Sequence, residues 1–460
     1  MFIGREKELT RLQQLFVEDK FQCAIIYGRR RVGKTTLIRE FIKDKKTIYF
    51  AGMETTEQNN LESFSKSIFE LSMGSEAAPT FRSFEDAFAF IGKLAKDERI
   101  ILVIDEFPYL AGAVKGISSV LQKYIDLHFL QSKLFIILCG SSMSFMENQV
   151  LGYQSPLYGR RTAQFKIEPF DFFEATLFYQ AFSAYELALI YGITGGIPQY
   201  LVKIDEKKSL RENIIENFLT PDSYLFEEPS NLLKQELREP QVYNAIITSI
   251  ATGSSKLNEI ATKTGLATSA AVQYLNSLIS LGLIKKEYPI TEQKSRKTIY
   301  RLEDNMFRFW YRFIPKNYSR IQKGFGEKVY GSVETELNDY MGIVFEEICT
   351  QYMWKLYKNE TLPIDLTDVG RWWGNNPKKK AEQEIDILAF NKNEAVFGEC
   401  KWRNELMDAG DYAALKGKAE MFEYKRKYYY LFSKSGFTEE MHEMAKKDER
   451  IRLISMEEMI

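Results

Sequence analysis

Four apolar runs in the first part of the chain predict buried strands. They lie at residues 23–27, 47–52, 100–105 and 134–142, and the segments between them repeat apolar residues at helical spacing. Continuous apolar runs that alternate with helices are typical of a parallel sheet covered on both faces. We therefore expect residues 1–165 to form an α/β domain around such a sheet.

Beyond residue 165 the pattern becomes mainly helical, and the rhythm of the apolar positions divides the rest of the chain into four segments. A helical segment comes first. Three short helices followed by two strands come next, which is the order of a winged helix. A basic and aromatic linker then leads into a second α/β domain. In order, these segments are residues 166–236, 237–302, 303–335 and 336–460.

Composition and charge narrow the class of protein without choosing a function. The chain has 460 residues, of which 45% are hydrophobic, and this length is typical of about three domains. The net charge of −1 gives no overall attraction to nucleic acid. The four cysteines form no C-x-x-C pair, histidines number two, and no apolar run reaches the roughly 18 residues of a membrane helix. We expect a cytoplasmic protein without a zinc site, a disulfide framework or a membrane partner.

The strongest motif follows the first predicted strand. Residues 28–35 match the phosphate-binding template G-x-x-x-x-G-K-[ST], with a strand before them and a helix after them. A glycine-rich turn that matches by chance would lack that context. Lys34 is expected to reach the β- and γ-phosphates of ATP, and the Thr35 hydroxyl to hold Mg²⁺. The residues expected to line the nucleotide are Gly28, Arg29, Arg30, Arg31, Val32, Gly33, Lys34, Thr35 and Thr36.

Two acids at the end of the third strand predict the hydrolytic part of this site. Asp105 ends the apolar run and Glu106 follows it. Asp105 is expected to ligate Mg²⁺, directly or through water, and Glu106 to orient or deprotonate the attacking water. Alone, two acids at a strand end are typical of a solvated loop. The phosphate-binding motif upstream favours the catalytic interpretation.

These motifs together resemble AAA+ ATPases. Residues 2–9, FIGREKEL, are similar to the N-terminal box of that family, and the resemblance puts Phe2 and Ile3 beside the adenine. It also puts Ser141 or Ser142, after the fourth strand, near the γ-phosphate as a polar sensor. A plain Gly-Ser turn fits the same residues equally well.

Two later features complete the predicted ATP site. Gly196 and Pro198 resemble the lid turn that contacts adenine in the signal-transduction branch of the family, though they also fit a helix start with no ligand role. Arg160 or Arg161 is a candidate arginine finger for the γ-phosphate, in cis or from a neighbouring subunit of a homo-oligomer. Adjacent arginines are also common on solvated surfaces.

The middle of the chain carries two candidate DNA-binding features. In the predicted winged helix, the third helix is poor in Arg and Lys, and its base readers are Gln273 and Asn276, so a packing helix is the alternative. Residues 281–330 hold twelve Lys or Arg against five Asp or Glu. Basic residues recur among aromatics there, which predicts a basic helical stripe unless Pro315 breaks it or the aromatics pack on the ATPase module. The stripe consists of Arg308, Arg312, Lys316 and Arg320.

A second carboxylate site is predicted near the C-terminus. EIDILAF and AVFGECKW predict two antiparallel strands joined by a turn at NKNE. They would bring Asp386 to Glu399 and Lys401, which share one strand face. Two carboxylates with a lysine suit a phosphodiesterase that uses Mg²⁺ or Mn²⁺, held by the acids, while the lysine stabilises charge in the transition state. A charged surface hairpin is the alternative.

The same residues resemble the PD-(D/E)XK nuclease fold. The resemblance makes Asp386, Glu399 and Lys401 catalytic, and it gives Glu346, on the preceding helix, the place of a further metal-binding acid. The usual Pro-Asp dipeptide of that fold is Ile385-Asp386 in this chain, which departs from the pattern.

The whole chain resembles an archaeal-type AAA+ ATPase with a helical lid, followed by a winged helix and a restriction-endonuclease-like α/β domain. The resemblance implies an ATP hydrolase that controls a metal-dependent nuclease with DNA as its partner. Two alternatives stay open. One is an ATP-dependent switch that binds DNA or protein without cleavage, and the other is a transcription regulator acting through the winged helix.

Overall fold

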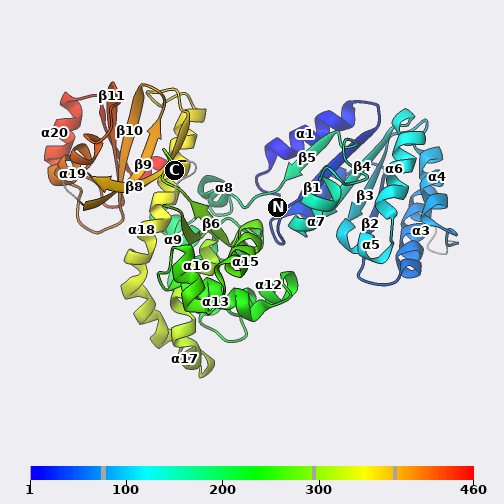
Figure 1. Ribbon diagram of the computed structural model, residues 1–460, viewed down its shortest axis with the longest axis horizontal. Helices are drawn as coiled ribbons and strands as arrows, with labels where there is room; N and C mark the ends of the chain where they lie inside the picture. Colours follow the sequence, from blue (N-terminus) through cyan, green and yellow to red (C-terminus); the bar gives the residue numbers. More distant parts are fainter. Residues whose placement is uncertain (1, 74–78, 293–296, 377–380) are drawn as a thin grey trace. The chain divides into compact units, whose positions relative to one another are not determined.

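A computed structural model describes residues 2–73, 79–292, 297–376 and 381–460 (Figure 1). The chain divides into two compact units. The boundary that the sequence predicts at residue 335 lies inside one continuous helix. The division of the chain into five separate domains therefore stays a prediction. The first unit is Met1–Pro169 with Ile197–Gln199, and the second is Phe170–Gly196 with Tyr200–Ile460.

The first unit contains a five-stranded parallel sheet with the strand order β2-β3-β4-β1-β5. Every residue of β1, β3 and β4 is buried, which is why these strands stand out in the sequence as unbroken apolar runs. The predicted parallel α/β class is confirmed for this part of the chain. The strands are β1 (Gln22–Tyr27), β2 (Thr47–Ala51), β3 (Ile100–Asp105), β4 (Leu134–Gly140) and β5 (Ala163–Lys166).

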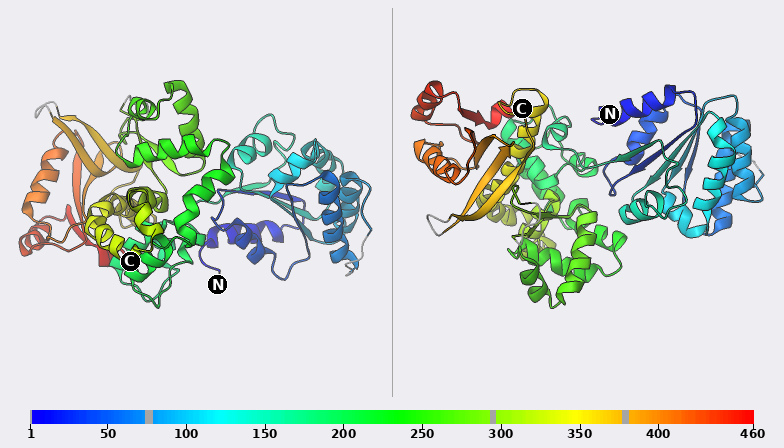
Figure 2. Two further views of the ribbon diagram at one scale, coloured as in Figure 1. Left: turned by 90° about the horizontal axis from the view of Figure 1, so that it is seen from below. Right: turned by 45° about the horizontal axis from the view of Figure 1, so that its top comes forward.

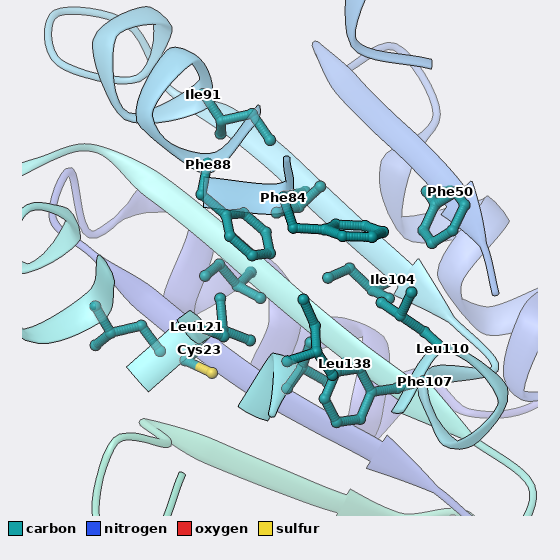
Figure 3. Close-up of a cluster of buried hydrophobic side chains, with 14 of the residues drawn as sticks. Cys23, Phe50, Phe84, Phe88, Ile91, Ile104, Phe107, Leu110, Leu121 and Leu138 are labelled. Atoms are coloured by element: carbon teal, nitrogen blue, oxygen red, sulfur yellow. The ribbon is translucent and has the colours of Figure 1, made fainter. Parts of the chain in front are cut away.

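A hydrophobic cluster fills the space between this sheet and the helices on one of its faces (Figure 3). Phe84 and Phe88 of α4 and Leu121 of α6 pack with the strand residues Ile104 and Leu138 in this cluster. The helices of the unit are α1 (Glu6–Val17), α2 (Lys34–Ile42), α3 (Glu57–Met73), α4 (Phe84–Leu94), α5 (Phe107–Ala113), α6 (Ile117–Leu127) and α7 (Met143–Phe145), with a 3-10 turn at Phe129–Gln131 and a π turn at Met146–Val150.

The helices of the second unit carry local end signals that the sequence predicts. In the capping box of α9, Ser183 Oγ accepts the N–H of Glu186, and the Glu186 carboxylate accepts the N–H of Ser183. Gly265, at a φ of 69°, ends α14. These helices are α8 (Phe172–Thr176), α9 (Ala184–Thr194), α11 (Leu210–Phe218), α12 (Tyr224–Glu236), α13 (Pro240–Ala251), α14 (Leu257–Thr264) and α15 (Thr268–Ser280), while the short α10 (Pro198–Leu201) begins in the first unit and ends in the second.

The three helices α13, α14 and α15 are followed by the antiparallel strands β6 (Ile284–Glu287) and β7 (Ile299–Leu302), in the predicted order. We call these two strands with the residues up to Ile290 the hairpin. Gln273 and Asn276 are exposed on α15.

The expected continuous basic stripe does not form. The helix α16 (Asn305–Phe313) ends before Pro315, which opens a 3-10 turn (Pro315–Asn317) and then α17 (Tyr318–Gln322). The aromatic residues of α16 other than Trp310 are buried inside the second unit, where α16 packs on α9 and α13. Arg308 is buried with them, and Arg312 and Lys316 both pair with Glu336. The stripe prediction is therefore wrong, because one of its members faces the core and two share a carboxylate.

A second five-stranded sheet occupies the C-terminal part of the second unit, with the order β12-β11-β10-β9-β8. The strands β8, β9 and β10 run antiparallel, whereas β10, β11 and β12 run parallel. Helices α19 and α20 cover one face and α18 crosses the other (Figures 1 and 2). The elements are α18 (Gly326–Lys358), β8 (Asp368–Asn376), β9 (Ala381–Phe390), β10 (Glu394–Lys401), α19 (Ala409–Ala419), β11 (Arg426–Ser433), α20 (Glu439–Lys447), β12 (Ile451–Ser455) and α21 (Met456–Met459).

Candidate nucleotide site and second carboxylate site

The predicted phosphate-binding loop lies between the end of β1 and the start of α2. Two of its positions require glycine. A Cβ on Gly28 would lie 2.3 Å from the backbone oxygen of Ile167, and Gly33, at a φ of 90°, precedes α2 in a conformation that favours glycine. The loop can therefore curl tightly, and α2 presents its N-terminal end to the enclosed space.

Lys34 lies inside the curl of this loop. Its Nζ donates to the carbonyl oxygens of Gly28 and Arg29, at 2.9 Å each, and its side chain is buried. Arg29 is also buried, whereas Arg30 Nη2 donates to the Tyr109 hydroxyl at 2.6 Å. The ammonium of Lys34 is thus held by the loop that is expected to wrap phosphate. Of the other expected positions, Arg31 and Val32 lie between Gly28 and α2, and Thr36 lies in the first turn of α2.

Asp105 connects the loop to the strands beside it. Its Oδ2 accepts the Thr35 hydroxyl at 3.2 Å and the Tyr49 hydroxyl at 2.5 Å, and its Oδ1 accepts the N–H of Glu106 at 3.0 Å. Burial, reinforced by the bond to Asp105, raises the pKa of Tyr49, so this hydroxyl stays a donor at neutral pH. From the sequence alone, Tyr49 is expected only to be a strand residue. Its position on β2, the strand next to β3, was the available signal.

Glu106 and Ser141 meet although 35 positions separate them. Glu106 Oε2 accepts the Ser141 hydroxyl at 3.0 Å and its backbone N–H at 3.3 Å. Glu106 has a φ of 47°, an uncommon conformation for a residue with a side chain. Of the two serines considered after β4, Ser141 makes this contact, and Ser142 precedes α7.

The ends of the first unit close around the loop backbone. Arg5 Nη2 donates to the carbonyl oxygens of Val32, at 3.3 Å, and Glu168, at 2.5 Å. Pro198 lies with its Cγ 3.6 Å from where a Cβ on Gly33 would be. The role of Arg5 was missed, because a turn residue at the chain start carries no local sign of a contact so far along the sequence. Phe2 and Ile3 are half-buried.

Arg160 and Arg161 lie away from the loop of their own chain. Arg160 makes two hydrogen bonds to Asp126, at 3.1 and 2.9 Å, near the C-terminal end of α6. The N–H of Thr162, the next residue after the pair, donates to Cys23 near the start of β1, whereas the loop follows the end of that strand. A strand of six residues spans about 20 Å. This placement does not favour contact with the γ-phosphate in cis.

The C-terminal carboxylates come together on β9 and β10. The two strands are antiparallel, and the predicted turn closes with Asn391 N–H donating to Glu394 O at 2.9 Å. Asp386 Oδ2 accepts the N–H of Cys400 at 2.9 Å. Glu399 accepts Lys401 Nζ on Oε1 at 2.6 Å. The predicted strand pair and the shared face of Glu399 and Lys401 are both present.

A second lysine, which was not expected from the sequence, pairs with Glu399. Lys418 of α19 donates its Nζ to Glu399 Oε2 at 2.8 Å. Burial acts to raise the pKa of Glu399, but Lys418 and Lys401 outweigh it and hold that pKa below its ordinary value. Burial and the charge of Glu399 raise the pKa of Asp386. The pKa values of the two carboxylates are thus shifted in opposite directions, because Lys418 and Lys401 stabilise the ionised form of Glu399.

Glu346 of α18 lies in the same electrostatic environment. Burial and the charges of Asp386 and Glu384 raise its pKa to about 9. Among the described residues its Oε2 is buried without a hydrogen-bond donor, although Arg371 Nε lies 3.3 Å away. Within the described ranges, no three His, Cys, Asp or Glu side chains are grouped closely enough to hold a metal ion.

The fold and the nucleotide site define the class of the protein as a P-loop ATPase. Residues 2–204 match a family described as an ATPase domain predominantly from Archaea, and residues 310–413 match a family of archaea bacterial proteins of unknown function. An uncharacterized protein of Methanocaldococcus jannaschii is 34% identical over 407 residues, which covers 88% of each chain. The chain belongs to this family of archaeal-type ATPases.

Two further similarities agree with this class. An uncharacterized ATP-binding protein of the same organism is 50% identical over 46 residues, which are 10% of this chain and 78% of that protein. The Walker-type ATPase of Pyrococcus abyssi has a similar fold, with a TM-score of 0.52 at 20% identity over 68% of this chain and 96% of that one. None of the helices in the described part of the chain is long and apolar enough to span a membrane.

Proposed function

We propose that the first unit hydrolyses ATP through the residues gathered around its phosphate-binding loop. The Lys34 ammonium would exchange the carbonyl oxygens of Gly28 and Arg29 for β- and γ-phosphate oxygens. Thr35 and Asp105 would hold Mg²⁺, which would neutralise phosphate charge in this site. The observation that carries the proposal is the 3.2 Å contact between Thr35 and Asp105, which brings the loop and the acidic strand end together.

Glu106 would be the general base of this reaction. Its carboxylate would accept a proton from the water that attacks the γ-phosphorus, while Ser141 keeps the carboxylate oriented. Pro198 would contact the nucleotide from the lid segment, which its position beside Gly33 supports. Arg160 or Arg161 would act on the ATP of a neighbouring subunit rather than on the ATP of its own chain. Both residues lie just before the start of β5, whereas the phosphate-binding loop follows the end of β1.

For the C-terminal sheet we propose a nuclease-like active site that cuts DNA. Asp386 and Glu399 would offer the hard oxygen ligands that Mg²⁺ or Mn²⁺ prefers, and Glu346 would be the further acid of the site once it moves closer to them. Such an ion, when bound, activates water and neutralises phosphate charge. Lys401 would stabilise the charge that develops on the phosphate, and Lys418 would keep Glu399 in place.

The convergence of Asp386, Glu399 and Lys401 carries this second proposal. A charged surface hairpin would leave these side chains exposed, whereas Glu399 is 8% exposed and Lys401 is 30% exposed. The segment α13–β7 would be the winged helix that brings nucleic acid to the site, with Gln273 and Asn276 exposed on α15. ATP bound to the first unit would control the outcome.

An ATP-dependent switch that binds DNA or protein without cutting is the second candidate. It is favoured by the two lysines on Glu399, which already neutralise that carboxylate. A cleavage assay separates the two candidates. Supercoiled plasmid is incubated with the full-length protein and Mn²⁺, and Asp386→Asn and Lys401→Ala are compared with the wild type. Cutting that both substitutions abolish establishes the nuclease. Binding without any cutting by the wild type establishes the switch.

A further inference from the structure

A cavity of about 360 Å³ lies among the helices α12, α13, α16 and α17 of the second unit. Helices α12, α13 and α16 pack on one another around it (Figure 1). Cavities of about 300–1,000 Å³ are typical of sites for small ligands. The described residues that line this cavity belong neither to the phosphate-binding loop nor to the C-terminal carboxylate site.

Aromatic side chains form the apolar wall of the cavity and are fixed by their neighbours. Trp310 Nε1 donates to the carbonyl oxygen of Phe226 at 2.8 Å, and the Tyr318 ring stacks on the Phe226 ring with 5.3 Å between the centroids. Tyr311 donates its hydroxyl to Asn244 Oδ1 at 2.6 Å. Phe226 and Tyr311 are buried, whereas Trp310 is half-buried and Tyr318 is 42% exposed. The wall is therefore ordered before a ligand binds, and two of its rings remain accessible.

Polar side chains of α12 and α13 line the rest of the cavity. Glu227, Ser230 and Lys234 recur at spacings of three and four residues, which puts them on one face of α12. Gln241 and Asn244 are likewise three residues apart on α13. A carboxylate accepts hydrogen bonds, an ammonium donates them, and hydroxyl and amide groups do both. The cavity thus combines aromatic faces with groups of both hydrogen-bonding kinds.

This combination favours a planar ligand whose edge both donates and accepts hydrogen bonds. A purely cationic ligand would be repelled by Lys234, and a purely anionic one by Glu227. A nucleobase has a flat face that stacks on aromatic side chains and an edge that carries donors and acceptors. We propose that the cavity binds a nucleobase, with its face against Trp310 and Tyr318 and its edge toward Gln241.

The base belongs either to a free nucleoside or nucleotide or to an unpaired position of a single strand, since both present the same face and edge. Helix α13 opens the α13–β7 segment, so a strand held by that segment would pass the cavity. Binding of a base requires neither ATP hydrolysis nor DNA cleavage, because neither proposed site contributes a described residue to the cavity.

The test is a fluorescence-anisotropy titration of the full-length protein, in EDTA, with a labelled single-stranded DNA and with an abasic strand of the same length. The abasic strand keeps the phosphates but lacks the bases, so the ratio of the two Kd values reports base binding. Tyr318→Ala is expected to raise the Kd for the strand with bases by about tenfold. Gln241→Ala is expected to raise it by about fivefold. Both should leave the Kd for the abasic strand unchanged, and Tyr318→Phe, which keeps the ring, should stay within about twofold of the wild type.

Free nucleosides identify the source of the base. They are titrated by calorimetry into the full-length Lys34→Ala protein, whose phosphate-binding loop lacks its lysine. A nucleoside Kd that Tyr318→Ala raises assigns the cavity to a free ligand. Base-dependent binding of the strand without binding of nucleosides assigns it to an unpaired base of a single strand.

A matched control separates the cavity from aromatic surface in general. Trp354 is 43% exposed on α18 and lies outside the cavity, so Trp354→Ala is expected to leave every Kd unchanged. A rise as large as that in Tyr318→Ala would overturn the assignment. So would base-dependent binding that neither Tyr318→Ala nor Gln241→Ala weakens, or strands that bind equally well with and without bases while no nucleoside binds.

Discussion

Ser141 donates both its hydroxyl and its backbone N–H to Oε2 of Glu106, at 3.0 and 3.3 Å. The two residues end neighbouring parallel strands, and their contact fixes the carboxylate that we propose as the general base. A base that is already held in its reactive orientation needs no further ordering before it accepts the proton. The proposed sensor residue and the proposed general base are thus in direct contact in this chain.

Removal of the Ser141 hydroxyl should lower turnover with little change in ATP affinity. We expect kcat of Ser141→Ala to fall by about tenfold and that of Glu106→Gln by about a hundredfold or more, since a positioned base typically contributes that much. Ser141→Thr keeps a hydroxyl and should recover most of the loss. Steady-state ATPase assays and nucleotide titrations measure both quantities. Ser142→Ala is the control, and an unaltered kcat in Ser141→Ala would show that the contact has no catalytic role.

The arginine pair offers a test of assembly. If Arg160 and Arg161 act on the ATP of a neighbouring copy, a variant with both changed to Ala should be inactive alone, and so should Lys34→Ala. An equimolar mixture of these two variants should recover part of the ATPase activity, because the Lys34→Ala copy supplies its arginines to an intact loop. A mixture as inactive as its components, under conditions where the wild type associates, would argue against action between subunits.

The buried pair of Arg308 and Glu347 should govern stability. Arg308 Nη2 lies 3.0 Å from Glu347 Oε1, and both side chains are largely buried. Arg308→Met leaves Glu347 without its main partner, so we expect the free energy of unfolding to fall by about 3–5 kcal/mol. Arg312→Met, on the same helix but in an exposed pair with Glu336, should cost about 1 kcal/mol or less. Urea unfolding of the second unit measures both.

The same pair should make stability depend on pH. Burial acts to raise the pKa of Glu347, but Arg308 and Lys285 outweigh it and hold that pKa below its ordinary value. The unfolded chain then binds the proton more readily than the folded chain, so the contribution is complete above the ordinary glutamate pKa and is lost as the pH falls through the folded value. Wild type should lose more stability between about pH 5 and pH 2 than Arg308→Met does, and an equal loss would contradict this origin.

The sequence was sufficient for features that local patterns encode. Gly28 and Gly33 mark the loop because backbone geometry there admits few other residues, and the buried strands are visible as apolar runs. The spacing of Glu399 and Lys401 likewise gave their shared face, because side chains alternate along a strand.

Contacts between distant segments were not predictable in the same way. Tyr49, Lys418 and Arg371 each reach a site acid from another element, and nothing near them in the sequence indicates the partner. Arg308 was predicted to face solvent because charge spacing does not reveal burial, which here is stabilised by Glu347 of α18.

Cleavage of supercoiled plasmid in the presence of Mg²⁺, measured with ATP, with ADP and without nucleotide, tests the central claim most directly. The account predicts cutting by the wild type that Asp386→Asn abolishes and that changes by at least about tenfold between ATP and no nucleotide, with no such change in Lys34→Ala. Cutting that depends on Asp386 but is the same with and without ATP would contradict control by the first unit. The absence of any Asp386-dependent cutting would contradict the nuclease.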